Sequence, residues 1–229
     1  MRRSLLELPL VALLLALATS CTSTRNIPLA DAERARMAEA AALHVVLRAP
    51  ASLTVRTPAD AALGGLGVVG LVAASQEFEQ EGESMRRRYQ LPDPARSAAE
   101  RFAAALRHKF GAPEASPAQD ADAEAEASAV AALFADGLVL DLRTEYWDLS
   151  YFGSGSMSRY RLDYRGSARL LEAPSGRVLW QARCVIEPPA ARRAIELEKL
   201  VADDAALLKQ KLAALGQACA DKLWVRLQR

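Results

Sequence analysis

The chain has 229 residues, of which 51% are hydrophobic and 25% are charged, the balance of an ordinary globular protein, so wholesale disorder is excluded. Lysine and arginine (29) nearly cancel aspartate and glutamate (28), and the net charge of +1 gives no reason to expect a nucleic-acid partner. Two histidines and three cysteines leave little material for a metal cluster, and we expect neither a metal site nor a cofactor.

The first twenty residues have the layout of a secretory signal peptide. Arg2 and Arg3 precede an apolar run over residues 8–18 that ends in small residues, which are the three parts of such a peptide. The run is shorter than the roughly 20 apolar residues that a permanent membrane helix needs. A buried N-terminal helix is the alternative interpretation.

Residues 17–21, LATSC, resemble a bacterial lipobox, in which small residues precede a cysteine. The resemblance implies that residues 1–20 are removed and that Cys21 carries fatty acyl chains such as palmitate. Because Thr22 stands where Asp usually directs inner-membrane retention, it also implies an outer-membrane lipoprotein that faces the periplasm. Plain secretion stays open, because an A-x-A cleavage site lies at 16–18.

A tether and then a single α+β domain follow the cysteine. Residues 21–42 begin with a polar, irregular stretch, and the Ala-rich, charged residues 31–42 favour a short helix. Apolar residues alternate over 43–47, which predicts a strand, and Pro50 just after it favours the edge of a sheet. We expect one folded domain over 43–229.

Residues 61–75, AALGGLGVVGLVAAS, are unusually rich in glycine. Gly64, Gly67 and Gly70 recur every third residue, and small residues at helical spacing allow two backbones to approach closely. A buried helix or loop is one interpretation, and a segment for self-association or membrane contact is another. A phosphate-binding loop is the third, although no Walker sequence ending in Lys-Ser or Lys-Thr occurs.

Two further helices and a loop are expected before the next strands. Three arginines at 86–88 fit the end of a helix, where they favour the dipole, and an anionic partner is the alternative. Residues 97–110 carry apolar residues four apart and end before Gly111, as an amphipathic helix does. Residues 112–128 are acidic and contain two prolines, so we expect a mobile loop, followed by a short helix through Phe134.

From residue 138 the hydrophobic period changes to two. Alternating runs over 138–143, 159–170 and 178–186 are joined by turns at 153–158 and 174–176, which predicts an antiparallel meander with one wet face. A long helix over 194–227, with leucines at spacings of three and four, is expected to lie on the sheet. The predicted fold class is therefore α+β, with about four antiparallel strands, three of them in the meander and one N-terminal strand at the edge, covered on one face by helices.

Cys184 falls on the apolar face of its strand, and Cys219 falls in the apolar stripe of the last helix. If that helix covers that face, the two thiols face each other, and an oxidising periplasm favours a disulfide between them. Two small buried hydrophobic residues that never pair are the alternative.

The sequence lacks the spacings typical of catalytic sites. His44 and His108 lie on a predicted strand and at a helix end, where surface or capping roles are expected. No H-E-x-x-H, G-x-S-x-G or S-x-x-K occurs, and the glycines and serines of 153–156 lie between two strands, as in a turn. We therefore do not expect an enzyme, and a hydrolase with an unrecognised site is the alternative.

Arginines are in excess on the polar face of the meander. Seven arginines face four carboxylates there, which favours cross-strand ion pairs. The alternative is a face for an anionic partner such as a lipid headgroup, a polysaccharide or a protein. Its candidate residues are Arg143, Arg159, Arg161, Arg165, Arg169 and Arg183.

Residues 138–225 resemble proteobacterial lipoproteins of unknown function. The resemblance rests on Tyr146–Trp147, on the strands RYRLDY and SGRVLWQARC, and on a helix with LVADDAALLKQKL and a second cysteine. The layout is similar to that of auxiliary envelope lipoproteins. It implies a binding accessory or scaffold anchored in the bilayer with an unknown envelope partner, and the alternative is a self-assembling membrane component that uses residues 61–75.

Overall fold

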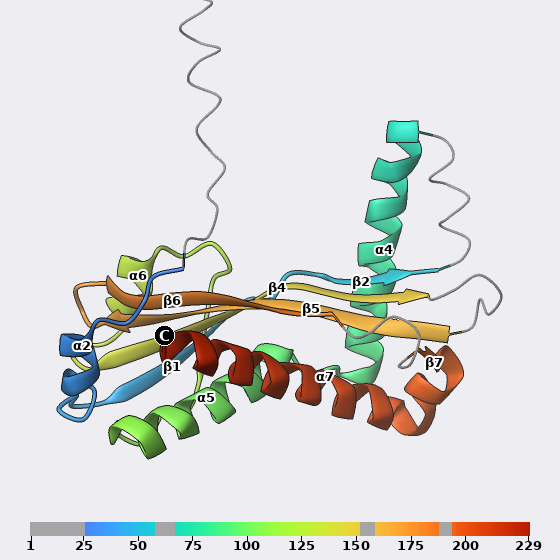
Figure 1. The fold of residues 1–229 in the computed structure, drawn as a ribbon. Helices are drawn as coiled ribbons and strands as arrows, with labels where there is room; N and C mark the ends of the chain where they lie inside the picture. Colours follow the sequence, from blue (N-terminus) through green and yellow to red (C-terminus); the bar gives the residue numbers. More distant parts are fainter. Residues whose placement is uncertain (1–25, 58–66, 152–158, 188–193) are drawn as a thin grey trace, which may run out of the picture.

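The computed structural model describes residues 26–57, 67–151, 159–187 and 194–229, so Cys21 and Gly64 lie outside the described residues. The described strands form a sheet, and the described helices lie on both sides of it (Figure 1). In chain order they are α2 (Asp31–Arg36), β1 (Leu43–Arg48), β2 (Leu53–Arg56), α4 (Gly67–Tyr89), α5 (Pro94–Phe110), β3 (Gln119–Ala121), α6 (Ala127–Ala131), β4 (Leu138–Tyr151), β5 (Arg159–Glu172), β6 (Arg177–Ile186), β7 (Ile195–Glu196) and α7 (Leu197–Leu227).

The strands form one mixed, seven-stranded sheet in the order β3-β1-β4-β5-β6, with β2 beside β4 and β7 beside β5. The antiparallel pairing of β4 with β5 and of β5 with β6 confirms the predicted meander. A register shift between Thr144 and Tyr146 interrupts the first of these pairings, as a β-bulge does.

The prediction of about four antiparallel strands was wrong in number and in direction. β1 and β2 both run parallel to β4, and β3 runs parallel to β1. The chain passes through α4 and α5 between β2 and β3, and a long helical connection of this kind is what parallel strands require. β1 is an inner strand rather than an edge strand, because β3 and β4 pair with its two sides, and Pro50 falls in the link to β2. The residues predicted as an acidic loop, 112–128, contain the edge strand β3.

Helices α5 and α7 cover one face of the sheet (Figure 1). Asp93 caps α5 by accepting a hydrogen bond from the Ala95 amide, Pro94 occupies the first turn, and Gly111 ends the helix with a φ of 70°. The predicted helix over 97–110 therefore starts earlier. The core between the sheet and these helices contains Trp147, Trp180 and Phe102, all buried.

The long C-terminal helix is present, but it is broken near its start. Ala202 has an extended backbone, and Asp203, Asp204 and Ala205 lie in the left-handed region. The part after the break lies along the sheet and α5 (Figure 1), and Leu200 before the break is buried in the same core. Residues VADDAA contain good helix formers, so hydrophobic spacing predicts no break there.

The folded body begins upstream of residue 43, the predicted start of the domain. Ile27 and Gln181 exchange two backbone hydrogen bonds, of 2.8 and 3.0 Å, which attach the N-terminal segment to the edge of β6. Leu29 and Met37 are buried in the same core as the sheet and helices. The stretch predicted as a tether is thus fixed to the body from Ile27 onward.

Gly67 and Gly70 lie in the first turns of α4, so this part of the glycine-rich segment is helical. The second half of α4 packs at the edge of β2, where a Cβ at Gly82 would overlap the backbone carbonyl of Leu53. Of the helices in the described ranges, none is long and apolar enough to span a bilayer.

Candidate functional site

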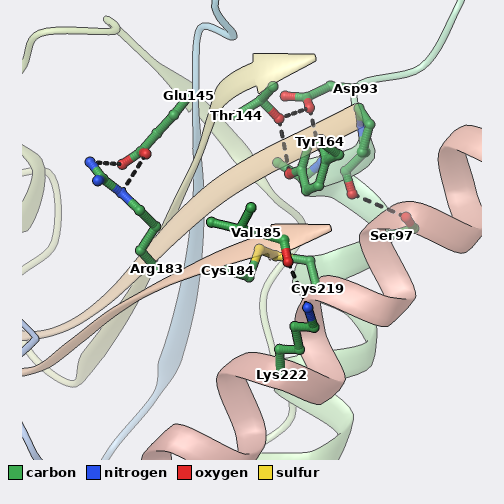
Figure 2. The surroundings of a disulfide bond; sticks show 12 residues. Asp93, Ser97, Thr144, Glu145, Tyr164, Arg183, Cys184, Val185, Cys219 and Lys222 are labelled. Atoms are coloured by element: carbon green, nitrogen blue, oxygen red, sulfur yellow. Dashed lines mark hydrogen bonds and ion pairs between the residues drawn. A yellow bond between two sulfur atoms is a disulfide. The ribbon is translucent and has the colours of Figure 1, made fainter. Parts of the chain in front are cut away.

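Cys184 and Cys219 form a disulfide between β6 and α7 (Figure 2). Their Cα atoms lie 5.4 Å apart, and both residues are buried. This agrees with the sequence prediction, which placed one thiol on the apolar strand face and the other in the helix stripe. The bond fixes the last helix to the sheet, and such bonds persist in oxidising compartments.

Polar contacts hold α7 on both sides of the disulfide. Lys222 donates from Nζ to the carbonyl oxygen of Val185 at 2.6 Å, which satisfies an acceptor on β6 (Figure 2). The Ser97 hydroxyl donates to the carbonyl oxygen of Ala213 at 3.0 Å and so ties α5 to α7. Gly216 faces the Pro94 carbonyl so closely that a Cβ would overlap it. These contacts make a rigid seam between β6, α5 and α7.

Asp93, Thr144 and Tyr164 form a polar cluster next to this seam, in which Thr144 and Tyr164 are buried (Figure 2). Thr144 donates its hydroxyl proton to Asp93, and its oxygen lies 3.1 Å from the Tyr164 hydroxyl. Burial raises the pKa of Asp93 above its ordinary value, although Thr144 and the Ala95 amide oppose the shift. Burial also raises the pKa of Tyr164. Because Asp93 caps α5 and Thr144 sits at the bulge of β4, the cluster holds helix and sheet together.

The opposite side of the sheet, which α5 and α7 do not cover, is lined with charged residues. We call it the charged face, and it comprises Arg48, Arg56, Asp141, Arg143, Glu145, Tyr146, Asp148, Arg161, Asp163, Arg165, Arg169, Arg183 and Glu187. These residues alternate with core residues along β1, β2, β4, β5 and β6. α6 covers one end of this side, where it packs on Val46, Val139 and Leu171.

Four of the six arginines predicted for an anionic partner already contact carboxylates of the chain. The shortest N–O distances of these pairs are 2.6 Å for Arg143–Glu124, 3.2 Å for Arg161–Asp163, 2.6 Å for Arg169–Asp141 and 2.7 Å for Arg183–Glu145. Arg159 instead donates to the carbonyl oxygen of Ala194. Arg165 lies over the ring of Tyr146, 5.5 Å from its centroid. Internal pairing therefore accounts for most of the arginine excess.

The deepest of these pairs was missed by the sequence analysis. Arg48 and Asp141 are both buried and meet in two hydrogen bonds of 2.9 and 3.1 Å. Arg169 adds two further donors to Asp141 from the other side, and Arg48 also donates to the carbonyl oxygen of Ala123. Arg48 was not among the candidates because it lies on β1, and only the parallel pairing with β4 brings it to Asp141.

A hollow of about 410 Å³ lies on the charged face. Its lining residues are Tyr146, Arg161, Asp163, Tyr164, Arg165, Val185 and Glu187. Asp163 stands directly opposite Asp148 in the pairing of β4 with β5. Burial raises the pKa of Asp163, Arg161 lowers it, and Asp148 and Glu187 raise it further.

Asp148, the partner of Asp163 across the strand pair, is held by Arg56. Its Nε donates to Asp148 at 3.0 Å, and another nitrogen donates to the Tyr146 hydroxyl at 3.0 Å. Burial alone would lower the pKa of Arg56, but Asp148 and Tyr146 raise it. Burial and Asp148 also raise the pKa of Tyr146. The hollow thus offers positively charged donors and negatively charged acceptors in fixed positions, which suits recognition of a polar ligand. Its seven lining residues include no serine, cysteine or histidine.

The remaining candidates lie apart from this hollow. His44 stacks on Phe134, with ring centroids 4.0 Å apart, and His108 is exposed near the end of α5. Of the basic run at 86–88, Arg86 pairs with Glu83 at 2.8 Å. Gly67 and Gly70 lie in the half of α4 that points away from the helices under the sheet (Figure 1). In the described part of the chain, no group of three or more potential side-chain ligands could hold a metal ion.

Comparison with known proteins gives only distant likenesses. No family model matches the chain, and no curated protein matches it. Among solved structures, the PelC dodecamer from Paraburkholderia phytofirmans is similar over 89% of this chain and 95% of its own, with 16% identity and a TM-score of 0.36. The protein XCC0632 of Xanthomonas campestris, described by family-model DUF330, is similar over 82% of this chain and 86% of its own, with 13% identity and a TM-score of 0.35.

A third likeness is to lipoprotein GNA1162 of Neisseria meningitidis. It extends over 79% of this chain and 98% of that protein, with 13% identity and a TM-score of 0.24. These identities and TM-scores are too low to establish a family or a function for this chain.

Proposed function

We propose that this protein is a lipid-anchored accessory or scaffold protein of the outer envelope, which acts by binding rather than by catalysis. The observation that carries the proposal is the sequence LATSC, which ends at Cys21 and follows a basic and then an apolar segment. Acylation of Cys21 would attach a folded domain to the periplasmic side of the outer membrane. Anchors with more than one acyl chain bind a bilayer firmly, whereas a single chain binds marginally.

The disulfide supports this location. Cys184 and Cys219 are joined inside the body and Cys21 is the predicted acylation site, so the proposal assigns a chemical state to every cysteine of the chain. A structural disulfide suits an oxidising periplasm and is rare in the cytosol.

The binding role is supported by the charged face. Its hollow holds donors and acceptors in fixed positions, with Arg161 and Asp163 paired along one side and Arg165 over Tyr146. Groups already held by neighbours lose little conformational freedom when a ligand binds. We assign this face to the envelope partner.

Self-assembly is the second candidate function, and one observation favours it. Gly67 and Gly70 lie at the start of α4, a helix that extends beyond the sheet (Figure 1), and small residues at helical spacing permit close helix pairs. Crosslinking in intact cells separates the two functions: one band with another protein supports the accessory role, and a ladder of homo-oligomers supports self-assembly.

Metabolic labelling with palmitate tests the anchor. We expect label in the full-length protein expressed in a Gram-negative host and none in Cys21→Ser. The matched control Ser20→Ala keeps a small residue before the cysteine and should remain labelled. Thr22→Asp tests the destination and should move the labelled protein from outer- to inner-membrane fractions. An unlabelled wild-type chain, or a product that begins at Thr19, would contradict the proposal.

A further inference from the structure

Two parts of α4 differ in what surrounds them. In the second half, Gly82 lies against the Leu53 backbone, and Met85 and Tyr89 pack on the core. In residues 75–81 every residue is exposed except Phe78, which is partly covered by Arg56. The helix thus leaves the body between Glu81 and Gly82, and Figure 1 shows its first half extending away from α5 and α7, past the plane of the sheet. We call residues 67–81 the α4 arm.

The composition of the α4 arm changes sharply along its length. Residues 67–74, GVVGLVAA, carry no charged or polar side chain, whereas the next seven include Glu77, Glu79 and Glu81. Eight helical residues are ~12 Å long. This is too short to cross a bilayer, and interfacial helices bury their apolar face by only about 5–10 Å. The apolar end is therefore long enough to enter one membrane interface but too short to cross the bilayer, and the glutamates would stop it from entering further.

The attachment of the N-terminal segment limits how far the body can be from the membrane. Ile27 is hydrogen-bonded to Gln181 on β6, so only residues 21–26 can extend between a lipidated Cys21 and the body. At about 3.3–3.6 Å per residue, six residues span roughly 20 Å. A body held within about 20 Å of the bilayer surface can bring an arm on one of its sides into contact with the lipid.

We propose that residues 67–74 of the α4 arm are a second membrane contact, which dips into the leaflet that holds the acyl chains of Cys21. This inference rests on the proposed function. The arm then sets the orientation of the body: the charged face, on the side to which the arm extends, faces the lipid surface, and α5 and α7 face the periplasm. The exposed residues 75–81 act as a spacer of ~10 Å, which keeps the hollow at Asp163 and Arg165 open to a partner that approaches along the membrane.

The arm can be tested with fluorescent labels on the full-length lipoprotein in vesicles of phosphatidylethanolamine and phosphatidylglycerol. With Cys21 acylated and the other two cysteines in a disulfide, one added cysteine takes a thiol-reactive, polarity-sensitive dye. Val72→Cys places the dye on the apolar end, Glu79→Cys places it on the spacer of the same helix, and Glu100→Cys places it on exposed α5. Doxyl-labelled lipids quench a dye that lies among acyl chains.

We expect the dye at position 72 to shift to the blue and to be quenched several-fold more strongly than the dyes at 79 and 100. Adding Leu71→Asp to the Val72→Cys chain should abolish the quenching without changing its urea midpoint. A dye at 72 that is as exposed to water as the dye at 100 would overturn the membrane contact. A dye at 72 that is shielded from water but not quenched by lipid would overturn it too and assign the arm to a second copy of the chain.

The anchor and the arm give separate readouts. Flotation of the chain with vesicles reports the acyl anchor, and quenching reports the arm. A chain that does not float contradicts the proposed function, and quenching at saturating vesicle concentration then still decides whether residues 67–74 contact lipid.

Discussion

The two faces of the sheet are built from the same strands but are stabilised in different ways. On the covered face, β6 carries Trp180 and Cys184 into an apolar core closed by α5, α7 and the disulfide. On the charged face, neighbouring residues of the same strands are held by ion pairs, of which Arg48–Asp141 is buried and most others are partly exposed. The covered face therefore depends on packing and a covalent bond. The stability of the charged face depends on pairs of opposite charge, several of which join strands that are far apart in sequence.

Removal of the buried carboxylate of Asp141 is expected to cause the largest loss of stability. Asp141→Asn leaves Arg48, which is 5% exposed, without its counter-charge. Removing one partner of a buried ion pair costs about 3–5 kcal/mol, because the other charge stays buried. We expect the free energy of unfolding, measured by urea denaturation, to fall by that amount.

An exposed pair on the same face is the matched control for Asp141. Arg143 is paired with Glu124, whose side chain is 84% exposed, and exposed pairs contribute ~0–1 kcal/mol. Arg143→Gln should therefore change the unfolding free energy by less than 1 kcal/mol. The double variant Arg48→Leu with Asp141→Leu should recover most of the loss, since apolar replacements of buried pairs are often close to neutral. Equal costs for Asp141→Asn and Arg143→Gln would show that burial does not decide the strength of these pairs.

Removing the disulfide tests the covered face. The bond closes a loop between residues 35 apart in sequence, and a loop of that length is expected to contribute about 3–4 kcal/mol in the chain-entropy description. The variant Cys184→Ala with Cys219→Ala should lower the urea midpoint of the oxidised protein accordingly. The reduced wild-type protein should move toward the same midpoint, and the variant should not respond to reductant. Identical midpoints for the oxidised wild type and the variant would contradict this account.

The comparison of the two faces also explains what the sequence could predict. Alternation with period two assigns each residue of β4, β5 and β6 to a face, and helix periodicity does the same for α7. These local patterns were sufficient to predict the meander and to place Cys184 opposite Cys219.

Strand direction and distant pairing were not predictable in this way. Alternation is the same in parallel and antiparallel strands, so nothing in residues 43–47 indicated that β1 runs parallel to β4. The partners Arg48 and Asp141 are 93 residues apart, and counting charges along the meander cannot pair them. β3 has three residues, too few to show a period. The sequence shows that residues 67–74 are apolar. Their position at the end of an arm could not be predicted, because it depends on where Gly82 packs against the body.

The smallest expected effect concerns the cap of α5, where Asp93 contacts Thr144 of β4. Burial raises the pKa of Asp93 above its ordinary value of about 4. The folded state therefore holds this proton more tightly than the unfolded state does. The stability that Asp93 contributes through protonation is present in full below pH ~4 and is lost as the pH rises through its folded pKa. The ionised carboxylate is therefore less favourable at this position in the folded protein than a neutral side chain would be.

Asp93→Asn isolates this effect, because an amide oxygen can still accept from the Ala95 amide and from the Thr144 hydroxyl. We expect Asp93→Asn to be at least as stable as the wild type at pH 7, and its advantage to decrease as the pH falls toward 4. Asp93→Ala loses the cap and should cost about 1 kcal/mol at both pH values. Taking the difference between the wild type and Asp93→Asn at each pH cancels the titration of the other carboxylates. If the wild type instead lost stability relative to Asp93→Asn on acidification, the pKa of Asp93 in the folded protein would be lowered, and Asp93 would stabilise α5 by its charge rather than by its hydrogen bonds.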